Sequence, residues 1–408
     1  MIFPASEWER IMKIQEIFAR ARHGKLTWKE AAEILGVDDR TVRRWKLTVE
    51  DCGYEALFDR RRRRPSPKRA PDRLRDRVLR LYRDTYRDWN IKHFHEQLPK
   101  HGVNYGYTWT KNLLKEAKLV EPSIKRDKHR KKRERKPMVG MMLHIDGSQH
   151  RWLPGSTRTQ DLIVVMDDAN NEIYYARLVD QESTVSCMEA IRYVVDTRGI
   201  FCSIYSDRAG HFFNTPEAGS KVDLGNLTQI GRALYEIGIQ MIPAYSPQAR
   251  GRSERAFRTW QGRLLNELKL HNITTIDAAN AYIQESFLPW YNANLIKTPL
   301  STGSAFTPYL GKNLDYVFCI KEQRVVNNDN TVQWHTLNLQ IQPSQFRISF
   351  AKCKVIVCHH LDNTISVLYG QHIIGRYNHQ GESINQTTIK TKKRTNHVLQ
   401  KADILMCY

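Results

Sequence analysis

The order of apolar segments between residues 138 and 296 constrains the fold more than any other feature of the chain. Three short strand-like runs come first, and two further strands then alternate with helix-like segments. Strands joined by helical crossovers run parallel, so the order predicts a mixed sheet in an α/β core. We expect strands at 141–145, 162–167, 173–179, 201–205 and 239–243, and helices at 184–197, 228–237 and from Glu254 to about Leu270.

Three acidic residues occupy comparable positions in this pattern. Asp146 ends the first strand, Asp207 ends the fourth, and Glu254 begins the last core helix. The strand order implies that the first and fourth strands are neighbours, so that their acids meet at one end of the sheet. The last helix carries an apolar stripe that we expect to pack on the sheet and to bring Glu254 to the same point. This stripe consists of Phe257, Trp260, Leu264 and Leu268.

Three clustered carboxylates repel one another unless cations lie between them. Hard oxygen ligands favour Mg²⁺ or Mn²⁺, and a pair of such ions can activate a hydroxyl or water for attack on a phosphodiester. The alternative for any single acid is an ordinary strand-end or capping residue. Asp167 and Asp168 also end a strand, and we interpret them as loop acids at a turn.

The net charge of +21 is distributed unevenly along the chain. Residues 1–136 hold 37 Lys and Arg against 20 Asp and Glu, whereas the remainder is nearly balanced. This asymmetry favours a polyanionic partner, nucleic acid before membrane. No apolar run is long enough to span a membrane, and no secretory signal is visible. The seven cysteines are scattered and are expected to be reduced in a cytoplasmic, nucleoid-associated protein.

Residues 1–58 show the spacing of a helix–turn–helix domain. A helix is expected over 8–24, a second one from a Thr27 cap to Leu35, and a third after Asp38 or Asp39, with Gly36 in the turn. Basic and polar side chains on the outer face of the third helix suit the major groove of DNA. They are Arg40, Thr41, Arg43, Arg44 and Lys46. The alternative is a small helical bundle with a solvated charged face.

Two basic linkers flank a second helical region. Residues 59–71 form an Arg/Pro linker, in which Arg61, Arg62, Arg63 and Arg64 are expected to lie on phosphates or in a minor groove. Residues 72–122 are predicted to be a second helix–turn–helix-like domain that binds DNA through Lys111 and Lys115. Residues 123–137 are so basic that they cannot form a core and are interpreted as another linker.

The segment after the core has short strands separated by turns. Residues 297–378 are predicted to form a small β-barrel, followed by a polar and basic tail over 379–408. Cys353 and Cys358 beside two histidines suggest zinc. They are an odd number of residues apart on a strand and therefore face opposite sides, which argues against a metal there.

Around the three acids the sequence resembles the integrase-core transposases of bacterial insertion sequences, a superfamily that includes retroviral integrases and the phage Mu transposase. The resemblance rests on His144–Ser148, Tyr205–Arg208 and 245–258. It implies an RNase H-like fold for residues 138–296 and catalytic, metal-binding roles for Asp146, Asp207 and Glu254. It also implies two Mg²⁺ or Mn²⁺ ions per site and transfer of DNA strand ends into a target.

Four arginines surround Glu254 and are expected to hold phosphates of the reacting strand, although surface charge on a helix would look the same. They are Arg250, Arg252, Arg255 and Arg258. The leading hypothesis is a DNA transposase that acts as a homo-oligomer on paired element ends of double-stranded DNA, with no membrane or small-molecule substrate. A transposase-derived DNA-binding regulator without catalysis, or an RNase H-fold nuclease without strand transfer, are the alternatives.

Overall fold

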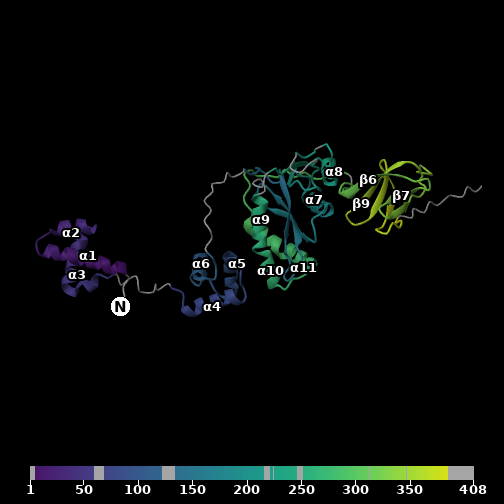
Figure 1. Ribbon diagram of the computed structural model, residues 1–408. Helices are drawn as coiled ribbons and strands as arrows, with labels where there is room; N and C mark the ends of the chain where they lie inside the picture. Colours follow the sequence, from purple (N-terminus) through teal and green to yellow (C-terminus); the bar gives the residue numbers. More distant parts are fainter. Residues whose placement is uncertain are drawn as a thin grey trace, which may run out of the picture. The chain divides into compact units, whose positions relative to one another are not determined.

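The computed structural model describes residues 5–58, 69–121, 134–215, 221–223, 225–245, 251–311, 313–345 and 347–384. The chain divides into two compact units, Met1–Thr85 and Tyr86–Tyr408. Each unit is described by itself below, and Figure 1 shows its elements.

The first unit contains the expected helix–turn–helix arrangement. A capping box joins Thr27 to Glu30 at the start of the second helix, Gly36 takes φ 65° in the turn, and Asp38 caps the third helix. The buried core includes Ile14, Phe18, Ala32, Val42 and Val49. Its elements are α1 (Ala5–Arg22), α2 (Trp28–Leu35), α3 (Asp39–Cys52), the short helix η1 (Tyr54–Leu57) and α4 (Asp72–Asp84).

The second unit is built on a five-stranded mixed sheet with the order β3-β2-β1-β4-β5. β1 pairs antiparallel with β2 and parallel with β4, and this neighbourhood of the first and fourth strands confirms the arrangement predicted from the sequence. The strands are β1 (Leu143–His150), β2 (Gln160–Asp167), β3 (Ile173–Val179), β4 (Ser203–Ser206) and β5 (Gln240–Pro243).

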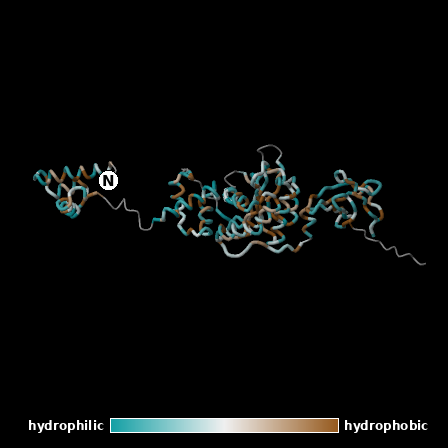
Figure 2. The backbone as a smooth tube through the Cα atoms, turned by 90° about the horizontal axis from the view of Figure 1, so that it is seen from below, coloured by the Kyte–Doolittle hydropathy of each residue, from teal (hydrophilic) through white to brown (hydrophobic). Residues whose placement is uncertain are grey.

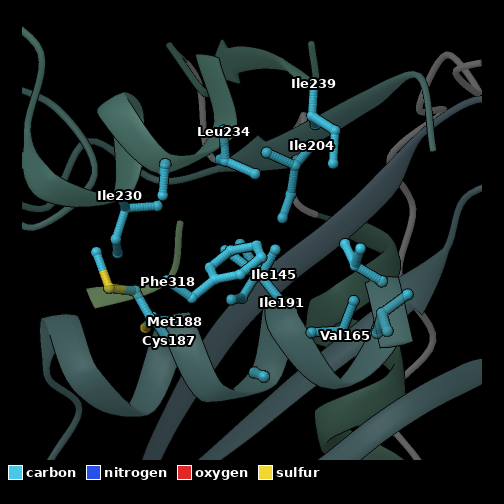
Figure 3. Close-up of a cluster of buried hydrophobic side chains, with 14 of the residues drawn as sticks. Ile145, Val165, Cys187, Met188, Ile191, Ile204, Ile230, Leu234, Ile239 and Phe318 are labelled. Atoms are coloured by element: carbon cyan, nitrogen blue, oxygen red, sulfur yellow. The ribbon is translucent and has the colours of Figure 1, made fainter. Parts of the chain in front are cut away.

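Helices cover both faces of this sheet (Figure 1). On one face, α7 (Thr184–Arg198) and α8 (Gln229–Glu236) bury a cluster that contains Ile145, Ile191, Ile204 and Leu234, shown in Figure 3. On the other face, α9 (Gly251–Gln261) packs Phe257 and Trp260 against apolar side chains of β2 and β3. Figure 2 shows hydrophobic residues gathered in the interior of this region.

The predicted single helix from Glu254 to about Leu270 is two helices in the structure. α9 ends at Gln261, and α10 spans Leu264–Leu270. Gly262 lies at the break, where its poor helix propensity weakens the helix. The apolar stripe nevertheless continues across the break, since Trp260, Leu264 and Leu268 are all fully buried in the same cluster.

Further helices complete the second unit. After α10 come α11 (Ile276–Tyr282), a π-helical turn η5 (Ile283–Phe287) and α12 (Leu288–Leu295). Before the sheet come α5 (Ile91–Gln97), η3 (Leu98–His101) and α6 (Tyr107–Glu116). The side chain of Arg263, which precedes α10, pairs with Glu96 of α5 at 2.6 Å.

The C-terminal strands do not close into the expected barrel, because the sheets they form are open. One sheet has four strands in the order β11-β10-β9-β6, and β7 and β8 form a separate pair. Both sheets share one apolar core, which contains Val332, Leu339, Val357 and Val367. The elements are η6 (Leu314–Tyr316), β6 (Cys319–Val325), β7 (Thr331–Trp334), β8 (Leu337–Gln340), β9 (Lys354–His360), β10 (Ile365–Tyr369) and β11 (His372–Tyr377).

Among the described residues, no helix combines the length and the hydrophobicity needed to cross a membrane.

Candidate active site

One open cavity of about 790 Å³ brings the three predicted acids together. Asp146, Asp207 and Glu254 all line it, although 61 and 47 residues separate them along the chain. The other lining residues are Gly147, Ser148, Arg208, Ala209, Ala244, Tyr245, Phe257, Arg258 and Gln261.

The parallel pairing of β1 with β4 places the two aspartates together. His144 is in register with Tyr205, so Asp146 and Asp207 follow the paired residues by two positions on each strand. Side chains two residues apart point to the same face of a strand. Asp146 is buried, with 7% of its surface exposed, and Asp207 is half-buried. The Asp207 carboxylate accepts a hydrogen bond from the backbone N–H of Ala209 at 3.1 Å, which holds it at the strand end.

Glu254 comes to the cavity from the first turn of α9. Phe257 and Trp260 bury the inner face of this helix, whereas Glu254 itself is exposed. The side chain of Gln261 donates a hydrogen bond to the hydroxyl of Ser148 at 3.2 Å, which ties the end of α9 to β1. The acid is therefore carried by a helix that is fixed to the sheet at its far end.

The donor set at the cavity fits a hard divalent cation. Three carboxylates that reach one open cavity offer only oxygen ligands, the chemistry that suits Mg²⁺ or Mn²⁺. Asp146, Asp207 and Glu254 would hold such ions.

The four arginines predicted around Glu254 have different surroundings. Arg258 lines the cavity, and Arg255 is exposed on α9. Arg252 forms an ion pair with the carboxylate of Asp168 and is largely buried, so its charge is already engaged within the protein. Its role in holding phosphate stays a prediction. Arg250 lies outside the described residues.

Asp167 ends β2 and Asp168 begins the turn that follows, as the sequence pattern predicted, but both side chains are fully buried. Burial raises the pKa of Asp167 above its ordinary value, despite hydrogen bonds from the backbone N–H groups of Gly140 and Ala169. Burial would raise the pKa of Asp168 as well, but hydrogen bonds from His144 and from the backbone of Lys136 hold that pKa well below its usual range. The sequence pattern of two acids at a strand end did not distinguish buried from solvated carboxylates.

Sequence reasoning missed several residues that line the cavity. Arg208 follows Asp207 directly, and its guanidinium lies over the ring of Tyr245, 5.2 Å from the ring centroid. Tyr245 follows β5, which runs parallel to β4. The sequence could have indicated Tyr245, because the carboxyl ends of neighbouring parallel strands meet at one edge of a sheet and the residues after β5 therefore lie at the same edge.

A second polar group lies beside this edge. The Glu182 carboxylate accepts a hydrogen bond from His211 at 3.1 Å and one from the buried thiol of Cys187 at 3.5 Å. A side chain at Gly147 would come within 2.2 Å of the Glu182 carboxylate and would displace it from its present position. These contacts link the segment before α7 to β1, which carries Asp146, and to the loop that follows Asp207.

The side chains that were predicted to bind DNA in the first unit are mostly accessible. Arg40, Arg43 and Arg44 are exposed on α3, and Thr41 is half-buried. Lys46 is half-buried, with its ammonium 4.8 Å from the ring centroid of Trp28 and 4.0 Å from Glu50.

Two other sets of predicted DNA-binding side chains lie in the linker and in the second helical region. Arg61, Arg62, Arg63 and Arg64 fall outside the described residues. Lys111 and Lys115 are half-buried on α6.

Comparisons with known proteins agree with this architecture. Residues 16–76 match the sequence family described as "Winged helix-turn helix". The chain is 28% identical over 395 residues to "Putative transposase y4bF" of Sinorhizobium fredii, a match that covers 96% of this chain and 86% of the relative. It is also 26% identical over 315 residues to "Transposase for insertion sequence IS1202" of Streptococcus pneumoniae, which covers 68% of this chain and 67% of the relative.

Retroviral integrases appear among the similar solved structures. The simian T-cell lymphotropic virus intasome in complex with PP2A regulatory subunit B56 gamma matches at 12% identity and a TM-score of 0.32, over 68% of this chain and 93% of that one. The HTLV-2 integrase catalytic core domain in complex with magnesium matches at 14% identity and a TM-score of 0.27, over 38% of this chain and 85% of that one.

The architecture is that of a helix–turn–helix protein with a mixed α/β core. More specifically, the chain resembles insertion-sequence transposases, and the resemblance to transposases that the sequence indicated is confirmed by these relatives.

Proposed function

We propose that this protein is a DNA transposase that binds the terminal repeats of its element, cleaves DNA at the 3′ ends and joins them to target DNA. The observation that carries the proposal is the convergence of Asp146, Asp207 and Glu254 on one open cavity. Similarity to transposases over nearly the whole chain supports the same activity. We further propose that the core has the RNase H-like fold and that the chain acts as a homo-oligomer on paired ends.

The carboxylates would hold two Mg²⁺ or Mn²⁺ ions, which when bound supply Lewis-acid activation of the attacking oxygen and neutralise charge on the leaving oxygen. The protein itself orients the reacting strand. Arg258 lies in the cavity beside the acids, where its guanidinium can pair with a phosphate in the fork geometry that arginine favours. Arg208 and Tyr245 also line the cavity and can contact the sugar–phosphate backbone of the same strand.

Amide substitutions at the three acids test this assignment. Asp146→Asn, Asp207→Asn and Glu254→Gln remove one negative charge each with little change in shape. We expect each variant to lose cleavage and joining by at least about 10³-fold while it still binds element ends, because the charged ligands are lost and the reading domain is untouched. Gel-based cleavage and joining assays in Mg²⁺, with end-binding measured on the same preparations, give the answer. A variant that cuts at the wild-type rate would contradict the site.

Two alternatives give different results for the wild-type chain. A transposase-derived regulator would bind ends but cut nothing in Mg²⁺ or Mn²⁺. A nuclease without strand transfer would cut, but would not join pre-cleaved 3′ ends to a target plasmid. The proposal requires that the wild-type chain does both and that EDTA stops both.

A further inference from the structure

The fully buried carboxylate of Asp168 connects the segments that carry two of the three acids. One of its oxygens, Oδ1, accepts a hydrogen bond from Nε2 of His144 at 2.7 Å and also pairs with the guanidinium of Arg252. His144 precedes Asp146 by two residues on β1, and Arg252 precedes Glu254 by two residues on α9. A single atom therefore ties the strand of one catalytic acid to the helix of another.

Asp168 also forms hydrogen bonds with the segment that leads from the basic linker into the core. Its second oxygen, Oδ2, accepts a hydrogen bond from the backbone N–H of Lys136 at 2.7 Å. The guanidinium of Arg135 donates to the backbone oxygens of Asp168 and Ala169 at 3.1 and 3.0 Å. The backbone N–H of Asp168 donates to Met142, directly before β1, at 3.0 Å.

The energetic reason for this arrangement lies in the buried charges. An unpaired buried carboxylate or guanidinium is costly, so Asp168 and Arg252 strongly favour staying together. Glu254 is itself exposed in the first turn of α9, and the polar contact of Arg252 with Asp168 fixes that turn close to β1. Gln261 fixes only the other end of α9, through Ser148.

We propose that Asp168 is a positioning residue, which sets the separation of Asp146 and Glu254 by holding His144 and Arg252. The inference rests on the proposed function, since it concerns the geometry with which the acids hold divalent cations. Residues behind the ligands of a metal site commonly change metal affinity or activity by about 10–100-fold when they are replaced.

Asp167 provides a matched control. It precedes Asp168 in sequence and is equally buried, but its carboxylate accepts hydrogen bonds from Gly140, Ala169 and Tyr174, none of which lies on β1 or α9. Asp167→Asn and Asp168→Asn therefore both disturb a buried carboxylate, and only the second releases the segments of the catalytic acids.

The first experiment measures the Mg²⁺ concentration that gives half-maximal DNA joining in the full-length wild type and in both variants. A second experiment measures hydrogen–deuterium exchange of residues 251–261 in the same proteins, without DNA or metal. For Asp168→Asn we expect a half-saturating Mg²⁺ concentration raised at least about 10-fold and faster exchange in α9. For Asp167→Asn we expect a lower melting temperature but wild-type values of both readouts. Equal effects of the two variants would overturn the inference, whereas an inactive wild type would instead overturn the proposed function.

Arg252 provides a second test if Asp168→Asn fails to fold. Arg252→Met should raise the half-saturating Mg²⁺ concentration and speed exchange in α9, and Arg252→Lys should restore part of both, because lysine keeps the charge. If Arg252→Met instead weakens DNA binding and leaves Mg²⁺ dependence and exchange unchanged, Arg252 acts on DNA and the inference is wrong.

Discussion

At the scale of single residues, the site depends on what surrounds the three acids as much as on the acids themselves. The sequence pattern singled out Asp146 and Asp207 as strand-end residues and Glu254 as a helix-start residue. In the structure Asp207 directly follows β4 and Glu254 lies in the first turn of α9, but Asp146 lies within β1, because pairing with β2 continues that strand to His150. The fit of Gly147 against Glu182 depends on residues 35 positions apart and only emerges in three dimensions. Similar acids have different environments, as the buried pair Asp167 and Asp168 shows.

The contact between Gly147 and Glu182 gives a prediction about stability. Gly147→Ala places a methyl group within 2.2 Å of the Glu182 carboxylate and should displace it from His211. Because the carboxylate ends a flexible side chain and can move, we expect the free energy of unfolding, measured by urea denaturation, to fall by about 0.5–1.5 kcal/mol, the contribution of the disturbed hydrogen bond.

Two comparisons check this interpretation. Gly210→Ala serves as the control, because a side chain there meets nothing within 4 Å. In a Glu182→Ala background, Gly147→Ala should cost little, since the crowding atoms are gone. A full cost in that background would show that Glu182 is not the cause.

At the scale of elements, helix ends and strand order were predictable, whereas contacts between distant helices were not. Thr27 and Asp38 cap helices where the sequence placed them, because capping depends on neighbours in the chain. The contact between α5 and α10 joins residues far apart in sequence. His93 and Glu267 meet at 2.5 Å, and Tyr282 donates to the same carboxylate at 3.2 Å.

Glu267 therefore gives a pH-dependent prediction. Burial raises its pKa, but the hydrogen bonds from His93 and Tyr282 outweigh burial and leave the pKa below its ordinary value. A lowered folded-state pKa stabilises the protein above the unfolded-state pKa of about 4.3, and this contribution is lost as the pH falls through the folded-state pKa. Glu267→Gln should cost about 1–3 kcal/mol at pH 7, and the difference from wild type should shrink below about pH 4.

Urea denaturation at several pH values measures this effect. Glu285→Gln is a suitable control because Glu285 is exposed, and it should stay within about 0.5 kcal/mol of wild type. If Glu267→Gln lowers the free energy of unfolding by the same amount at every pH, the packing of this side chain, and not its charge, provides the stabilisation.

At the scale of the whole molecule, the charge asymmetry corresponds to a division of the chain. The basic first third contains the helix–turn–helix unit, and the nearly neutral remainder contains the α/β core with its acids. The accessible arginines of α3 are separated along the chain from the cavity, so DNA reading and DNA cleavage are expected to respond to different substitutions.

The arginines of α3 test this division. Replacement of Arg40, Arg43 and Arg44 together by alanine should weaken binding to element ends. The slope of log affinity against log salt concentration should decrease in magnitude by up to about 3, because fewer phosphates are contacted and fewer counterions are released on binding. Melting temperature should change little, since the three side chains are exposed.

Replacement of Arg20, Arg22 and Lys25 removes the same charge from exposed positions before α2 and serves as the control. Equal salt slopes for the two triple variants would indicate that only net charge matters and that α3 has no special role. Binding should be measured by fluorescence anisotropy with element-end and unrelated duplexes.

The sequence by itself predicted most of the core elements and their order and singled out the three acids that line the cavity, because strand alternation, helix periodicity and capping are local properties of the chain. The neighbourhood of the first and fourth strands also followed, since the meander and the crossover leave few arrangements. Only the tertiary structure decided which charges are buried, that Arg252 faces Asp168 and that the C-terminal sheets stay open. The physical reason is that burial and pairing of charges depend on residues brought together from distant parts of the chain, which a linear pattern does not encode.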